Sequence, residues 1–305
     1  MPSLRNAALA AAALVVVLTA VHWPRDVDPV STGNEWLERP DYRAFYGVDD
    51  HAGAAQPAAS LSAAMPRTSP ETSPEADSVR RFVRQHGLES ARVLEVGAGT
   101  GGLQDVVADY VGLDISSQVR AHFHKPFVQA SATQMPFPDG AFDAIWTINV
   151  LEHVPGPEQA LTEMRRVLKD GGLLYLLAAW QCRPWAANGY HVRPYGDFGL
   201  GGKFVKLSIP LRESVAFRAV YVFPIRLWRV AASLAGGAPT AFRYTRLTPN
   251  YEQYWAADSD AVNSMDPYEA ILWFTSRGDE VLSFEGALTP FFVRSGTIVV
   301  RIRKP

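Results

Sequence analysis

The sequence predicts an α/β domain in which a mostly parallel sheet is covered by helices on both faces. Short apolar runs alternate with helical segments from residue 75 onward, and this alternation is typical of parallel strands joined by helices. One apolar run, at residues 93–96, continues directly into a glycine-rich turn. Of the 305 residues, 48% are apolar and 20% are charged, which is ordinary for a globular protein with a full core.

The first 24 residues are predicted to be a hydrophobic anchor or signal. Residues 7–21 carry no charge and are almost wholly apolar. This run is somewhat shorter than the ~20 residues of a typical transmembrane helix, and Trp23 suits an interfacial position after it. Leu18 stands where cleavage after Ala20 would need a small side chain, so a single membrane anchor is favoured over a cleaved signal.

Residues 25–74 are predicted to be a linker that is partly disordered. Residues 51–76 are rich in alanine, proline and serine, and such a stretch cannot bury a core. An upstream cluster is too aromatic for a pure linker and suits docking on the domain. It consists of Trp36, Tyr42, Phe45 and Tyr46.

The domain itself is predicted to span residues 75–305. Strands are expected at residues 93–96, 110–115, 127–130, 144–148, 173–177, 281–284 and 297–302. Helices are expected at residues 75–86, 103–107, 116–124, 157–169 and 267–277. The first has an apolar face and ends before Gly87, and the last begins with an Asp266 cap followed by Pro267.

The glycine turn is the part of the domain that indicates a ligand. Gly97, Gly99 and Gly102 fit a G-x-G-x-x-G spacing, and glycine lets bare N–H groups approach a bound molecule. This spacing also occurs in dinucleotide sites, where Asp114 would bind a ribose. Glu95 argues for another ligand, because its negative charge favours a cation over a pyrophosphate.

Five motifs occur in a fixed order around this turn. They read V-L-E-V-G-A-G-T-G, V-G-L-D, M-P-F-P-D-G-A-F-D, L-E-H-V and V-L-K-D-G-G. Over residues 75–178 the chain resembles the class I S-adenosylmethionine-dependent methyltransferases, in particular the broad type 11 family. The resemblance implies a Rossmann-like seven-stranded sheet with an antiparallel last strand. It makes residues 179–263 an insertion between the fifth and sixth strands, serving as a substrate lid.

The resemblance also implies that the chain is an enzyme with S-adenosylmethionine as its cofactor. The residues that correspond to the family's cofactor site are Glu95, Gly97, Ala98, Gly99, Gly101, Asp114, Ser131, Ala132, Asn149 and Leu151. The glycine loop would lie under the methionine part, with Glu95 near its cationic end, and Asp114 would bind the ribose hydroxyls. Ala132 would pack on adenine. Ser131 is a departure, because the family commonly has aspartate there.

Two histidines are candidates for a catalytic role. His153 follows the fourth strand, next to Glu152. The alternative is that its side chain has only a structural role, as a cap or in packing. His191 lies in the insertion. The insertion's further candidates for substrate contact are Tyr195, Asp197, Asp258 and Asp260. Because the sulfonium already activates the methyl group, orientation is the chief requirement, and the sequence does not name a general base.

The insertion also indicates where the acceptor resides. Residues 183–246 contain ten basic and two acidic residues, interleaved with aromatic side chains. Residues 224–234 are expected to form an amphipathic helix with Arg226 and Arg229 on its polar side, which suits an anionic membrane surface. A lid packed on the sheet is the alternative. Together with the anchor, this pattern predicts a hydrophobic or membrane-resident small-molecule acceptor.

The location follows from the cofactor. S-adenosylmethionine is made in the cytosol, so the domain of an anchored chain is expected to face it; a cytoplasmic chain is the alternative. The net charge of −2 argues against a nucleic-acid partner. Cys182 is the only cysteine and the histidines are scattered, so no metal site is expected. Two other functions stay open: a non-catalytic cofactor-binding protein of the same fold, and an NAD(P)-dependent oxidoreductase.

Overall fold

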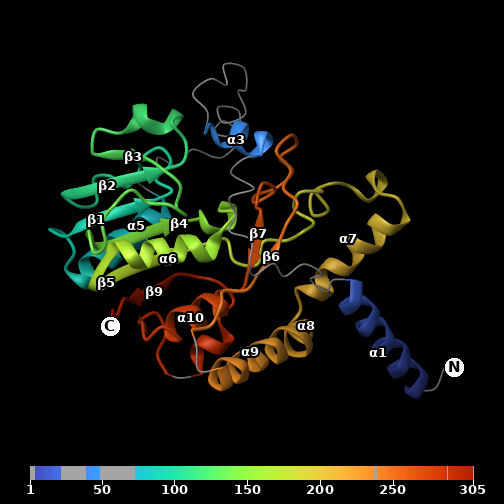
Figure 1. Cartoon of the computed structure of the whole chain (residues 1–305). Coiled ribbons are helices and arrows are strands. Elements are labelled where there is room, and N and C mark those ends of the chain that lie inside the picture. Colours follow the sequence, from blue (N-terminus) through green and yellow to red (C-terminus); the bar gives the residue numbers. More distant parts are fainter. Residues whose placement is uncertain (1–3, 22–38, 49–72, 237–238, 287, 305) are drawn as a thin grey trace.

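A seven-stranded sheet forms the centre of the domain. The computed structural model describes residues 4–21, 39–48, 73–236, 239–286 and 288–304. The strands lie in the order β3-β2-β1-β4-β5-β9-β8 (Figure 1). Their bounds are β1 (Arg92–Val96), β2 (Asp109–Asp114), β3 (Phe127–Gln129), β4 (Phe142–Ile148), β5 (Leu168–Leu177), β8 (Glu280–Val281) and β9 (Ile298–Arg301). The first five pair in parallel, whereas β9 is antiparallel to β5 and to β8. The predicted Rossmann-like sheet is confirmed.

Helices cover both faces of this sheet. They are α5 (Pro74–His86), α6 (Pro157–Val167) and α10 (Pro267–Thr275). Leu94 and Val96 of β1 pack in one cluster with α6 and α10, whereas Val93 packs with α5 on the opposite face. The alternation follows from the two-residue period of a strand. Because parallel strands point the same way, the turns that follow β1, β2 and β4 meet at one edge.

The predicted helix at residues 103–107 is wrong. This segment forms turns, although Leu103 and Val107 are buried. Since β2 begins at Asp109, too few residues separate it from the glycine turn to form two helical turns. The expected helix at residues 116–124 is a 3₁₀ turn, η2 (Gln118–His122). In addition, α6 ends at Val167, because residues 168–172 already belong to β5.

Residues 179–263 lie between β5 and α10 and contain most of the remaining elements. They include η4 (Tyr195–Asp197), α7 (Leu200–Arg212), α8 (Val215–Phe217), η5 (Arg218–Val222), α9 (Phe223–Gly236) and β6 (Tyr244–Arg246), which pairs with β7 (Asn263–Met265). Figure 1 shows α7, α8 and α9 following one another on the side of the molecule away from β1, β2 and β3.

The arginines of α9 do not face solvent, which differs from the prediction. Arg226 has only 2% of its side chain exposed and pairs with Asp266 at 2.5 Å, while Arg229 pairs with Glu269 at 2.8 Å. Both acids lie at the start of α10, so the two charges attach α9 to the domain. The exposed side of α9 instead presents Leu227 and Trp228.

Among the described residues before the domain are the helices α1 (Leu4–Val21) and α3 (Pro40–Tyr46). Across the described ranges, no helix combines the length and the apolarity needed to cross a membrane. Part of the predicted linker is thus helical. Trp36 and most of the alanine- and proline-rich stretch lie outside the described residues.

The burial of Arg226 leads to a stability prediction. Arg226→Met should lower the free energy of unfolding by about 3–5 kcal/mol, because it removes the buried cation that pairs with Asp266 and donates to the Val293 carbonyl. Arg80→Met, in an exposed pair with Asp77, is the matched control and should change it by less than about 0.5 kcal/mol. Chemical denaturation measures both; equal effects would show that Arg226 is no anchor.

Candidate functional site

A cavity of about 210 Å³ opens at the edge where the turns after β1, β2 and β4 meet. Its walls come from these turns, from the segment after β3, from residues 153–155 and from α3. The lining residues are Tyr42, Tyr46, Gly97, Leu113, Asp114, Ile115, Ala130, Ser131, Ala132, Ile148, Asn149, Val150, His153, Val154 and Pro155. Of the predicted site residues, the fold therefore brings together Gly97, Asp114, Ser131, Ala132, Asn149 and His153.

The turn after β1 requires glycine at its first position. Gly97 has a φ of 74°, and a Cβ there would lie 2.2 Å from Cγ2 of Val150. The N–H groups of Gly97 and Ala98 both bond to the Leu113 carbonyl, at 2.8 and 3.0 Å. These two bonds hold the turn against the end of β2, and the cavity lies beside the turn.

Asp114 connects the two turns. Its Oδ2 accepts a hydrogen bond from Gly99 N–H at 2.8 Å, and its Oδ1 accepts one from Ser116 N–H at 2.9 Å. Burial raises the pKa of this carboxyl, and the N–H groups of Ser116 and Gly99 oppose the shift. A carboxylate oxygen can accept more than one hydrogen bond, so Asp114 can still bind ligand hydroxyl groups.

Ser131, Ala132 and Asn149 form the side walls. Ser131 Oγ lies 2.8 Å from Thr133 Oγ1 and accepts from Thr133 N–H at 3.2 Å, which fixes its position at the wall. Asn149 follows β4 with a φ of 52°, a left-handed conformation that turns the chain away from the sheet.

The other predicted cofactor residues do not line the cavity. Glu95 is buried beneath the turn, where its Oε2 accepts from Tyr110 Oη–H at 2.5 Å, and burial raises the pKa of Glu95 to about 8. Leu151 packs in the core. Ala98, Gly99 and Gly101 belong to the turn that Gly97 begins, but they do not line the cavity.

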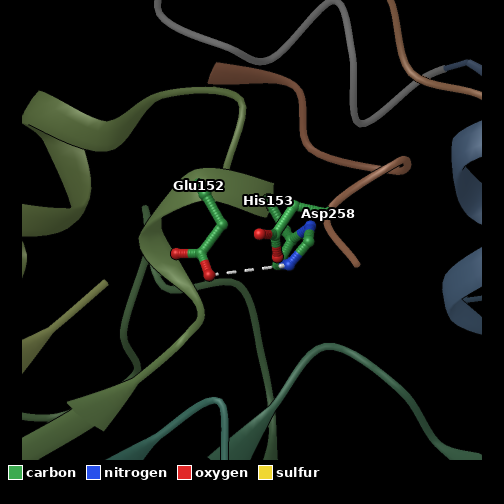
Figure 2. A group of neighbouring side chains, drawn as sticks. All are labelled: Glu152, His153 and Asp258. Atoms are coloured by element: carbon green, nitrogen blue, oxygen red, sulfur yellow. Dashed lines mark ion pairs between the residues drawn. The ribbon is translucent and has the colours of Figure 1, made fainter. Parts of the chain in front are cut away.

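His153 also lines the cavity, and it lies in a cluster of acids. Its Nδ1 is 3.2 Å from Asp260 Oδ2, and its Nε2 is 3.7 Å from Glu152 Oε1. Figure 2 shows Glu152, His153 and Asp258 with their polar ends turned toward one another. Glu152 and His153 belong to η3 (Leu151–His153), directly after β4, whereas the two aspartates come from the end of the insertion.

Backbone contacts hold the end of the insertion in this place. Val262 N–H bonds to the Glu152 carbonyl at 3.0 Å, and the Asn263 side chain donates to the Val154 carbonyl at 2.6 Å. The predicted candidates Asp258 and Asp260 therefore reach His153. The candidates His191, Tyr195 and Asp197 are not among the lining residues; His191 Nε2 lies 3.2 Å from Arg183 Nη1.

The helix α3 forms a wall that the sequence did not place. Tyr42 is 3% exposed and donates to the His153 carbonyl at 3.1 Å, while Tyr46 donates to Asp260 Oδ2 at 2.9 Å. Phe45 packs on Tyr251 with ring centroids 4.7 Å apart. The aromatic residues of the linker were the signal, but nothing in the sequence indicated where they dock.

The sequence of this chain is similar to those of known methyltransferases. A family model described as a methyltransferase domain matches residues 94–176, from β1 to β5. The sterol 24-C-methyltransferase of Gibberella zeae is 40% identical over 98 residues, which cover 27% of this chain and 26% of that protein.

Two further relatives match longer segments. The ubiquinone biosynthesis O-methyltransferase of Dechloromonas aromatica is 26% identical over 181 residues, covering 54% of this chain and 73% of that protein. The 2-methyl-6-phytyl-1,4-hydroquinone methyltransferase of Synechocystis is 29% identical over 194 residues, covering 57% and 58%. The chain thus spans less than two thirds of the first and third relatives.

The matched segment contains the glycine turn, Asp114, Ser131 and Asn149, and so includes most of the cavity wall. Its strands are the parallel part of the sheet. The chain therefore carries an S-adenosylmethionine-dependent methyltransferase domain of the type 11 family.

Proposed function

We propose that the chain transfers a methyl group from S-adenosylmethionine to a small, lipophilic acceptor. The observation that supports this proposal is that one cavity is lined both by Gly97 and Asp114 and by His153, Val154 and Pro155. Asp114 and the glycine turn suit the adenosine part of the cofactor, and the residues around His153 would lie beside an acceptor. The names of the three relatives, which act on sterol, ubiquinone-type and hydroquinone compounds, support this class of acceptor.

The cofactor supplies the activated methyl group, and the protein supplies position. Asp114 would hold the ribose hydroxyls, and Asn149 and Val150 would flank the methionine part. Glu95 would lie beneath the turn, hydrogen-bonded to Tyr110, rather than against the cofactor. Because the displacement is in line, the acceptor must approach from the side of His153. We propose His153 as the residue that faces the acceptor.

We also propose that the chain works at a membrane, with the domain on the cytosolic side. The apolar helix α1 and the exposed Leu227, Trp228 and Leu234 of α9 support this location, since they would meet acyl chains or head groups.

Trp228→Ser should reduce sedimentation with phospholipid vesicles, whereas Arg81→Ser on α5 should not. Equal sedimentation of both variants with the wild type would remove α9 from the contact.

The ribose assignment predicts a loss of cofactor affinity. Asp114→Ala should weaken binding of S-adenosylhomocysteine about tenfold or more, because a charged hydrogen bond is lost. Asp109→Ala, at the exposed opposite end of β2, is the control and should bind as the wild type does. Titration calorimetry with NADH in parallel tests the oxidoreductase alternative. Unchanged affinity of Asp114→Ala would contradict the assignment.

The position of His153 predicts a catalytic defect. His153→Ala should lower kcat about a hundredfold or more while leaving S-adenosylhomocysteine affinity within about twofold, because the residue acts on the acceptor. Transfer of labelled methyl groups into a lipid extract measures kcat. His122→Ala, exposed on η2, is the control, and His191→Ala tests the second predicted histidine. If His153→Ala turned over at the wild-type rate, the proposed role of His153 would be refuted. If the wild type bound the cofactor but transferred no methyl group, a non-catalytic protein would be favoured.

A further inference from the structure

We propose that Glu152, His153 and Asp258 form a binding site for a divalent cation at the wall of the cofactor cavity. Each side chain offers one ligand atom, and these atoms all lie within 4.8 Å of one another. Ligands on opposite sides of a divalent cation are about 4–5 Å apart, twice a metal–oxygen distance of about 2.0–2.5 Å. The group shown in Figure 2 can therefore close around one ion with small side-chain rotations.

The carboxyl group of Glu152 is the observation that requires a ligand. The side chain is 0% exposed, and in the part of the chain that the structure describes neither oxygen has a partner that meets the distance and angle of a hydrogen bond, although the backbone N–H groups of Glu152 and Ala179 lie close enough to stabilise its charge. A buried carboxyl that makes no well-aligned hydrogen bond is costly whether it is charged or neutral. A cation bound to one of its oxygens would offset this cost.

The surroundings of His153 match those of a metal ligand. A histidine that binds a metal through one ring nitrogen usually donates its other N–H to a carboxylate. Here Nε2 faces Glu152, while Nδ1 lies 3.2 Å from Asp260 Oδ2, an ion-pair distance without hydrogen-bond geometry in the described residues. Asp260 is fixed in turn by Tyr46, which donates to the same oxygen at 2.9 Å. Asp260 would thus orient the ligand without binding the ion itself.

Asp258 supplies the third side chain of the site. It has a φ of 63°, a conformation that is uncommon for a residue other than glycine. Its side chain brings a third ligand atom to those of Glu152 and His153, and a divalent cation would offset the charges of the two carboxylates. No metal site was expected from the sequence, because Asp258 is far from Glu152 and His153 in the chain.

The cation gives His153 its place in the reaction, and this step rests on the proposed function. An acceptor hydroxyl bound to the ion would release its proton to water, since the positive charge stabilises the resulting oxyanion. The oxygen then forms a bond to the methyl carbon while the sulfur–methyl bond breaks, and its electron pair stays on S-adenosylhomocysteine. His153 therefore acts as a ligand rather than as the proton acceptor, and the acceptor class is a lipophilic hydroxyl compound.

Binding of Mn²⁺ to the full chain tests the site without cofactor or acceptor. The protein is treated with chelator, dialysed and titrated with Mn²⁺, while electron paramagnetic resonance measures the free ion. We expect one bound ion per chain, with affinity reduced about tenfold or more in Glu152→Gln and in Asp258→Asn. Asp105→Asn is the matched control, because it removes another histidine–carboxylate contact, that of His124 at 3.0 Å, and should leave binding unchanged.

The outcomes separate the cation site from the proposed function. Failure of the wild type to bind Mn²⁺, or wild-type affinity in both variants, would overturn the site. Glu152 is buried, so Asp258→Asn, which is partly exposed, keeps the test valid if Glu152→Gln does not fold. S-adenosylhomocysteine binding without Mn²⁺ binding would refute the cation site alone. Mn²⁺ binding without S-adenosylhomocysteine binding would refute the proposed function and leave the site standing.

Discussion

The carboxylate of Asp114 joins the turns that follow β1 and β2, and the site depends on that connection. Its two oxygens accept the N–H groups of Gly99 and Ser116, so neither turn can move without the other. The Leu113 carbonyl, which accepts from Gly97 and Ala98, adds a second link between the same strands. The parallel register of β1 with β2 sets these groups side by side. The cavity lies in front of the turns because side chains there are absent or small.

A second set of contacts brings the insertion to this edge. The chain leaves β5, forms α7 to α9 and returns to η3, where Val262 and Asn263 bond to backbone carbonyls. The paired arginines of α9 hold the outer part of the insertion on α10. As a result, aspartates distant in sequence meet His153, and α3 closes the same region through Tyr42 and Tyr46. The surroundings of His153 are thus built from three separate segments.

The sequence alone predicted what is encoded locally. The alternation of apolar runs indicated the sheet, and the glycine spacing with Asp114 indicated the turn, because strand, turn and binding residue are close neighbours in the chain. The helix at residues 103–107 was mispredicted, since local apolar spacing does not reveal how soon the next strand must begin. The burial of Arg226, the docking of α3 and the meeting of Asp258 with Glu152 are long-range contacts. No local pattern specifies them, and Glu95 shows that a motif residue can lie beneath a site rather than in it.

The most direct test of the account is a crystal structure of the full chain with S-adenosylhomocysteine. We expect the ribose hydroxyls within hydrogen-bond distance of Asp114, the adenine beside Ala132, and the sulfur directed toward His153. Nucleoside bound elsewhere on the chain, or a sulfur directed away from His153, would contradict it.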